Sequence, residues 1–339
     1  MALQGAEVRT KIVMDPGGTA EATLEIGLVQ SLTPSSSTTA TTETGLGGIV
    51  KKRLTAQEFN FGWEGLITNK NTLNAGLPLD SGVPYTLDLY MHDEKLSGAQ
   101  VATMSLSGSE GEALNYSLEG QFLTHATVTP ADADDPDTYF VYSDGSFYFG
   151  NTTSITSETP TGSGTNYETA QDFIEPGTLV ITADAATITD GGDGTLSDGG
   201  TINYLTGAFV LNASATTVSV DYDYYGSQET IQSFNVDVSR TINFVYGTSL
   251  SPTSLEVGTT TYSGSIEVQA SSFSAAMDGA VASGTPDFGF MLSFVNPISA
   301  ETMLIIGTGA QFTAADGSVD PDSALTVTKT FEFEAMTVS

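Results

Sequence analysis

The chain of 339 residues is predicted to be an all-β protein, from its composition and from the spacing of its apolar residues. Thr, Ser, Gly, Val, Tyr and Phe are frequent while Leu, Lys and Arg are scarce, which is typical of strands and turns. The clearest apolar patterns alternate with a period of two, and almost nothing recurs at helical spacing. The length allows two or three units that each bury a core.

One segment of the first half recurs at the C-terminal end. "GAQVATMSLSGSEGEALNYSLEGQF" (98–122) aligns without gaps on "GAQFTAADGSVDPDSALTVTKTFEF" (309–333), a constant offset of 211 residues. Gly-Ala-Gln, Ala-Leu and the final Phe coincide, and both segments go on to alternate in the same phase. We interpret the match as an internal duplication of a β unit.

A weaker match lies upstream in each half. Trp63-x-Gly65-x-Ile67 resembles Tyr262-x-Gly264-x-Ile266 at an offset of 199. The strongest alternating strand of the chain, "FNVDVSRTINFVY" (234–246), opens the second copy. A strand of this length suits a hairpin that extends beyond one compact core.

The first copy contains a long polar run, "TPSSSTTATTETGLGGIVKKR" (33–53). A run with so few apolar residues cannot cover a core, so we expect an exposed, mobile loop in the monomer. It ends in Lys51, Lys52 and Arg53, the basic cluster of the sequence. Two interpretations stay open: a solvated loop tip, or an arm that becomes ordered on a neighbouring acidic subunit.

Three segments are expected from the composition. Residues 1–128 form the first β unit and residues 229–339 the second. Residues 129–228, which begin acidic and turn-rich and continue as short strands, form an inserted small β domain between the copies. Short helices are expected in "YETAQDFIE" (167–175) and "SSFSAAMDGAVASG" (271–284).

The charge balance excludes the usual nucleic-acid binders. The formal net charge is −32, and residues 129–228 contain no Lys or Arg. Such a surface repels a phosphate backbone, which requires a basic footprint to bind. Adaptation to high salt is a second explanation of the acidity. The N-terminal residues carry charges where a secretory signal needs an apolar core, so we expect synthesis in the cytoplasm without a signal peptide.

The sequence contains few of the side chains that usually act in catalysis or bind metal ions. There is no Cys, and the two histidines, His92 and His125, are read as structural. "DGGDGTLSDGG" offers Asp190, Asp193 and Asp198 as weak metal candidates, but it lacks the ligand spacing of an EF-hand and the tandem repeats of a nonapeptide calcium motif. We read it as a hairpin turn with opportunistic calcium binding as the alternative, and we expect neither a cofactor nor an enzymatic activity.

Two cations interrupt apolar strand faces. Arg240 shares a face with Phe234 and Val238, and Lys329 shares one with Phe331 and Phe333. We expect each to snorkel or to pair with a carboxylate at a subunit contact.

These features resemble the tail tube (major tail) proteins of long-tailed, siphovirus-like phages and archaeal tailed viruses. The resemblance rests on residues 233–268, which are similar to the long first strands of that family, and on "SALTVTKTFEFEAMTV" (323–338), similar to its final strand. "GGTINYLTGAFVLNASATTVSVDYDY" (199–224) is similar to small β segments of virion structural proteins. The 100-residue insertion and the low basic content depart from smaller members.

The resemblance implies a structural role in the virion tail. Two tandem sandwich or barrel units would make the chain a subunit of a trimeric ring with pseudo-six-fold symmetry, a hexamer being the alternative, and rings would stack into a tube together with other tail proteins. Double-stranded DNA would pass through the lumen without specific binding. Lys51, Lys52, Arg53, Arg240 and Lys329 are the candidate assembly residues.

Two other classes share the composition. A virion decoration or receptor-binding protein would have the same cytoplasmic origin without tube closure. A surface adhesin or surface-layer module would also be rich in Thr and Ser, but the expected lack of a signal peptide counts against it.

Overall fold

The computed structural model of the chain describes residues 10–18, 21–25, 29–44, 50–77, 85–91, 93–129, 139–150, 152–192, 194–225, 231–269, 288–296, 298–318 and 326–338. Strands dominate these residues, and their helical segments are two short 3₁₀ turns, η2 (Lys70–Ala75) and η3 (Tyr142–Asp144). The all-β prediction is therefore confirmed.

The strands in chain order are β1 (Thr10–Met14), β2 (Ala22–Glu25), β3 (Val29–Leu32), β4 (Ser35–Thr44), β5 (Val50–Leu66), β6 (Leu87–Met91), β7 (Glu94–Ser109), β8 (Asn115–Gln121), β9 (Thr124–Thr127), β10 (Gly145–Gly150), β11 (Thr152–Glu158), β12 (Thr161–Glu168), β13 (Val180–Ala183), β14 (Ala186–Thr189), β15 (Thr201–Asn203), β16 (Ala208–Ala215), β17 (Val218–Tyr225), β18 (Ile231–Tyr246), β19 (Pro252–Gln269), β20 (Phe288–Val295), β21 (Thr302–Ser318), β22 (Thr326–Phe333) and β23 (Ala335–Val338).

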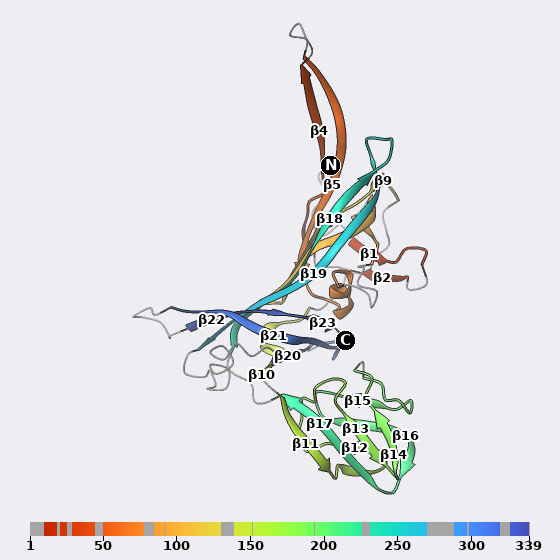
Figure 1. Cartoon of the computed structure of the whole chain (residues 1–339), viewed down its shortest axis with the longest axis vertical. Helices are drawn as coiled ribbons and strands as arrows, with labels where there is room; N and C mark the ends of the chain where they lie inside the picture. The colour runs from red at the N-terminus through yellow and green to blue at the C-terminus, as the bar shows by residue number, and fades with distance from the viewer. Residues whose placement is uncertain are drawn as a thin grey trace.

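One large antiparallel sheet carries both halves of the chain. Its central run is β21-β22-β19-β18-β7-β8-β5, with β3 and β4 pairing on the far side of β5. Two long hairpins, β4 with β5 and β18 with β19, extend from this run (Figure 1). Because β18 pairs with β7, the two halves of the chain are joined by the same kind of ladder that builds each half.

Period-two alternation puts one face of the central run into a core. Along β18, Phe234, Val236 and Val238 are buried while the residues between them are only partly so. On the first half, the fully buried Trp63 of β5 donates from its indole nitrogen to the Tyr116 hydroxyl at 2.8 Å. Burial raises the pKa of Tyr116, so the phenol stays protonated at neutral pH.

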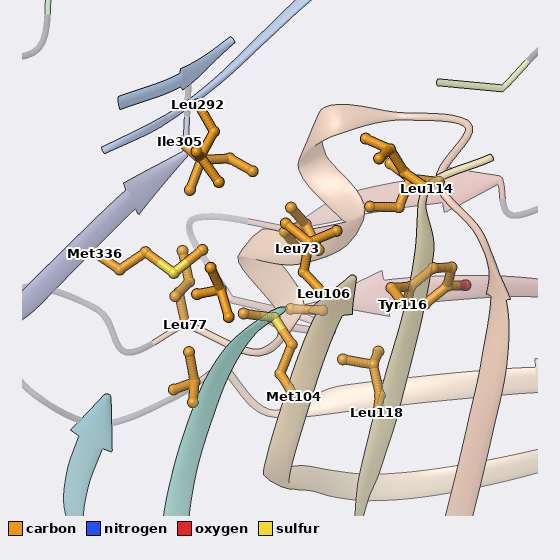
Figure 2. Packing of buried hydrophobic residues seen from close by; sticks show 14 of the residues in the cluster. Leu73, Leu77, Met104, Leu106, Leu114, Tyr116, Leu118, Leu292, Ile305 and Met336 are labelled. Atoms are coloured by element: carbon orange, nitrogen blue, oxygen red, sulfur yellow. The ribbon is translucent and has the colours of Figure 1, made fainter. Parts of the chain in front are cut away.

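The core of the first half is completed by the turn η2 and the residues after it. Leu73 and Leu77 lie between Met104, Leu106 and Leu118 on one side and Leu292, Ile305 and Met336 of the second half on the other (Figure 2). All of these side chains belong to one hydrophobic cluster. The two halves therefore share a core as well as a sheet.

The strand ladders show that the second half repeats the first. In the β7–β8 ladder, Gln100 faces Gln121, and in the β21–β22 ladder Gln311 faces Glu332, each residue 211 positions later than its counterpart. The two ladders even share one irregularity, a register shift after Val101 and after Phe312. The β7–β9 and β21–β23 ladders agree in the same way, with Ser97 opposite Thr124 and Thr308 opposite Ala335.

Two glycines hold the same special conformation in both copies. Gly98 has φ +66° and Gly309 has φ +63°, in the left-handed region that favours glycine. Next to them, the amide of Leu123 donates to the Ser97 carbonyl at 3.0 Å, and the amide of Glu334 donates to the Thr308 carbonyl at 3.0 Å. The expected duplication is thus present in the backbone geometry, down to a single hydrogen bond.

The weaker sequence match is corrected by the strand registers. Trp63 faces Leu118 of β8, and Ile266 faces Lys329 of β22, which is the counterpart of Leu118. Trp63 therefore corresponds to Ile266, and the offset between β5 and β19 is 203 residues instead of 199. The sequence match failed because alternating strands also match when they slide by an even number of residues.

The described residues of the polar run are mostly strand and not loop, because 35–44 and 50–53 form a hairpin arm. β4 pairs with β5 from Ser35 opposite Asn60 to Thr44 opposite Val50. This hairpin is the counterpart of β18–β19, because Ser31 opposite Glu64 repeats as Ser233 opposite Glu267, again beside a register shift. Thr has high strand propensity, and a two-stranded arm needs no buried face, so polarity did not exclude a strand here.

The inserted segment forms two small sheets of its own, β11-β17-β13-β14 and β12-β16-β15, drawn in green in Figure 1. Its core joins the second half through Met291, Leu304 and Ile306. β10 precedes it and pairs with β20 as β1 pairs with β6, so β10 is the first strand of the second copy. The insertion therefore follows that strand and does not lie between two complete copies.

One of the two expected helices is not formed. Tyr167 and Glu168 end β12, and the chain then bends to Ile174. Thr169 accounts for this, because its hydroxyl donates to the Gln171 carbonyl at 2.7 Å and its amide to Gly207 at 3.1 Å, in competition with a helix. The other expected helix, 271–284, lies outside the described residues.

The repeated glycine conformation predicts matched mutational costs. Gly98→Ala and Gly309→Ala should each lower the free energy of unfolding by about 1–2 kcal/mol, because a side chain at positive φ is strained and the added Cβ approaches Leu123 or Glu334. Chemical denaturation measures this, with Gly247→Ala as the control, since Gly247 has no positive φ and meets only Thr253 at 3.4 Å. An equal cost at all three positions would contradict the assignment.

Candidate functional site

The face of the central run that points away from the core is a continuous polar surface, called the polar face below. It is made by the residues that alternate with the core residues on six strands. They are Asn60, Gly62 and Glu64 of β5; Asn115, Ser117, Glu119 and Gln121 of β8; Thr103, Ser105 and Ser107 of β7; Ser233, Asn235, Asp237 and Ser239 of β18; Ser263, Ser265 and Glu267 of β19; and Thr328, Thr330 and Glu332 of β22.

Small hydroxyl groups and carboxylates pair across the strands of the polar face. The Ser31 hydroxyl donates to Glu64 at 3.5 Å, and its counterpart Ser233 donates to Glu267 at 3.2 Å. Where the two halves meet, the Ser105 hydroxyl donates to Asn235 at 2.9 Å. The same Ser–Glu pair thus recurs in both copies, and the surface continues across their junction.

No Lys, Arg or His is among the residues of the polar face defined above. Its charged residues are the carboxylates Glu64, Glu119, Asp237, Glu267 and Glu332. Neighbouring negative charges without counter-charges produce a uniformly negative potential. A phosphate backbone near this face would be repelled.

The two strand cations, Arg240 and Lys329, lie on the opposite, buried face. Arg240 donates through Nη2 to the Gly76 carbonyl after η2, while its Nε and Nη1 have no hydrogen-bond partner among the described residues. Burial lowers the pKa of its guanidinium. Arg240 therefore ties the second half to the first inside one chain, and its role at a contact between subunits stays a prediction, as does that of Lys329.

The basic cluster lies on the β4–β5 arm. Lys51, Lys52 and Arg53 of β5 face Glu43, Thr42 and Thr41 of β4 in the register of the hairpin. The matching arm, β18–β19, contacts β5, where the Gln57 amide donates to the Leu250 carbonyl and the Tyr246 hydroxyl to the Gln57 carbonyl, both at 3.0 Å. An arm of one unit thus docks on the edge of the next unit within the chain.

Two carboxylates of the Asp-Gly loop, those of Asp190 and Asp198, already have hydrogen-bond partners. Asp190 accepts from the Gly177 amide at 2.6 Å, from Gly192 at 3.0 Å and from the Tyr204 hydroxyl at 2.6 Å. Asp198 accepts from the amides of Gly200 and Asn212 at 2.8 and 2.9 Å. Both thereby serve as turn-stabilising acceptors. Asp193 lies outside the described residues.

Other candidate chemistry is sparse within the described ranges. They contain no group of three or more His, Asp or Glu side chains placed to hold a metal ion. His125 on β9 lies 3.6 Å from Glu94, an exposed pair, and His92 lies outside the described residues. Among the described segments, no helix has the length and apolar character needed to cross a membrane.

Two strand edges complete the site. Among the described strands, β3 and β4 form ladders with β5 alone, and residues 314–318 of β21 form a ladder with β22 alone. By the duplication, β3–β4 is the counterpart of β18 and β21 the counterpart of β7, the two strands that pair with each other inside the chain. The chain therefore ends in two edges that are complementary to each other.

The polar face could not be recognised in the sequence, because each of its residues is an ordinary strand residue. A signal was nevertheless present: Ser, Asn or Asp occupies every position that alternates with apolar residues in 233–239, and Thr or Glu alternates with Lys329 and Phe331 in 328–332. That phase predicts a sheet that is wet on one side.

Comparison with known proteins identifies no relative. No protein-family model matches the chain, and a search of curated proteins gives no match.

The uncompensated charge predicts a salt-dependent stability. Raising the NaCl concentration from 0.1 M to 1 M shortens the Debye length from about 10 Å to about 3 Å, so the melting temperature should rise by several degrees as carboxylate repulsion is screened. Thermal melts followed by circular dichroism measure this. At a pH of about 4, where many carboxylates are neutral, the rise should shrink. A melting temperature independent of NaCl at neutral pH would contradict the role given to repulsion.

Proposed function

We propose that the chain is a virion structural protein, the major subunit of a tail tube through which double-stranded DNA passes. Its copies assemble into rings and the rings stack into a tube, together with other tail proteins. A ring holds three copies, each giving two pseudo-equivalent units, and a hexameric ring is the alternative. The proposed role is mechanical, and no catalytic residue or cofactor takes part in it.

The observation that carries this proposal is the polar face, a continuous surface with several carboxylates and no cation. In a closed ring this face lines the lumen. Like charge on wall and phosphate keeps DNA away from the wall, and small Ser and Thr side chains leave the wall without groups that grip a base or a backbone. Such a surface lets a genome slide.

The duplication supports a ring in a second way. The two units of one chain meet head to tail through β18 and β7, which is a heterologous contact. A heterologous contact that repeats gives a closed ring when its rotation closes. Through the complementary edges at Ser35 of β4 and at residues 314–318 of β21, the same contact can continue from one subunit to the next.

Electron microscopy of the purified full chain tests the assembly. Negative-stain images at high protein concentration and in high salt should show rings or tubes of uniform bore. Dispersed monomers under these conditions would contradict the proposal.

Charge reversal on the polar face tests the DNA-conducting role. Tubes of wild-type protein should not retain linear double-stranded DNA in a co-sedimentation assay. The double variant Glu64→Lys with Glu267→Lys should retain it, at least tenfold more than wild type at low salt, with the binding lost as salt rises. The matched control, Glu168→Lys with Asp172→Lys, makes the same charge change on exposed residues of the insertion and should retain none. Equal binding by both variants would mean that the polar face does not meet the DNA.

A further inference from the structure

The junction between the two units of one chain has a defined hydrogen-bond pattern. The amide of Glu110 donates to the Gln232 carbonyl at 2.9 Å, which marks this pair as a hydrogen-bonded one. In an antiparallel ladder hydrogen-bonded and non-hydrogen-bonded pairs alternate. Continuing along the register, Val236 opposite Leu106 is a hydrogen-bonded pair, and Asp237 opposite Ser105 is a non-hydrogen-bonded one.

The duplication predicts the register in which the β3–β4 edge would pair with the β21 edge of another subunit. The counterparts of Val236 and Asp237 on the first unit are Pro34 and Ser35, because Ser35 faces Asn60 as Asp237 faces Ser263. The counterparts of Leu106 and Ser105 on the second unit lie 211 residues later, at Gly317 and Asp316. A contact between two subunits that repeats the junction between the two units of one chain therefore places Pro34 opposite Gly317 and Ser35 opposite Asp316.

Pro34 faces that edge without a donor. The amide of Thr33 donates to the Gly62 carbonyl at 2.8 Å, and the Gly62 amide donates back to Thr33 at 3.3 Å, so the backbone polar groups of Thr33 point towards β5. The nitrogen of the next residue, Pro34, then points to the free edge, where it is exposed. Proline has no backbone N–H to donate, whereas Val236, its counterpart at the junction within the chain, has one.

We propose that β21 of a neighbouring subunit pairs with the β3–β4 edge in the register Ser35 opposite Asp316. We also propose that this junction lacks one backbone hydrogen bond because Pro34 has no N–H. The junction between copies is thereby weaker than the otherwise matching junction within a chain. Proline on an edge strand is a known means of suppressing premature pairing, so free subunits stay soluble until assembly is favoured. The inference rests on the proposed assembly of copies into rings, but not on what passes through them.

Disulfide cross-linking tests the register. The chain has no Cys, so paired substitutions report without background. Non-hydrogen-bonded pairs bring side chains close, and Ser35→Cys with Asp316→Cys should give disulfide-linked oligomers on mild oxidation. Asp237→Cys with Ser105→Cys is the matched intramolecular control and should form a disulfide within one chain, with no linked oligomer. Ser35→Cys with Ala314→Cys is shifted by two residues and should cross-link at least tenfold less. Equal yields from the matched and shifted pairs would overturn the register.

Restoring the donor tests the role of Pro34. Pro34→Ala and Pro34→Val should each assemble at a protein concentration about fivefold lower than wild type, as expected for one added hydrogen bond per junction. Light scattering across a dilution series measures this, and circular dichroism confirms that each variant is folded. Thr33→Val changes the neighbouring side chain without adding an outward donor and should leave the assembly concentration unchanged. An unchanged or higher assembly concentration for both Pro34 variants would overturn the proposal.

Failure of this inference and failure of the proposed function give different results. If the chain forms tubes that carry no DNA, the Ser35–Asp316 cross-link still forms. If tubes form through other edges, electron microscopy shows them while the cross-link is absent.

Discussion

The antiparallel pairing of β18 with β7 is the interaction on which the rest of the structure depends. It joins two copies of one unit into a single sheet, so that their apolar residues fill one core and their polar residues form one face. A shift of this pairing by one residue would send Phe234 and Val236 to the polar face and Asn235 and Asp237 into the core. Burial of the apolar side chains therefore fixes the register, and the register fixes which edges remain free.

The charge of the chain is arranged by the same alternation. Carboxylates occupy the polar face and the insertion, while Arg240 and Lys329 occupy the buried face of the central run. Repulsion among the carboxylates opposes compaction, and the shared core has to offset it. In the proposed tail tube, the same repulsion would keep DNA away from the wall.

The sequence predicted the fold class and the most specific part of the duplication. Different physical reasons explain why some of its predictions agree with the structure and others do not. The 211-residue match held because Gly98 and Gly309 mark a conformation that only glycine adopts readily, and such a marker cannot slide along a strand. The match of Trp63 with Tyr262 failed because alternation alone is compatible with any even shift. The polar composition of 33–53 predicts a loop, whereas a paired arm such as β4–β5 needs no buried face and can form from residues with strand propensity alone.

The polar face and the complementary edges could not be predicted, because both depend on which strands pair, and pairing partners such as β18 and β7 are far apart in sequence. Arg240 shows the same limit. The sequence placed it on the apolar face of its strand, but its hydrogen-bond partner, the Gly76 carbonyl, lies 164 residues away in the chain.

The proposed assembly requires the sheet to continue from one subunit to the next with the polar face turned inward. Electron cryomicroscopy of the assembled full chain tests it most directly. We expect a ring of pseudo-six-fold symmetry with three inserted units outside, β21 of each copy paired with β3–β4 of its neighbour, and Glu64 and Glu267 facing the lumen. A reconstruction with these carboxylates on the outer surface, or with the copies joined through other strands, would contradict the account.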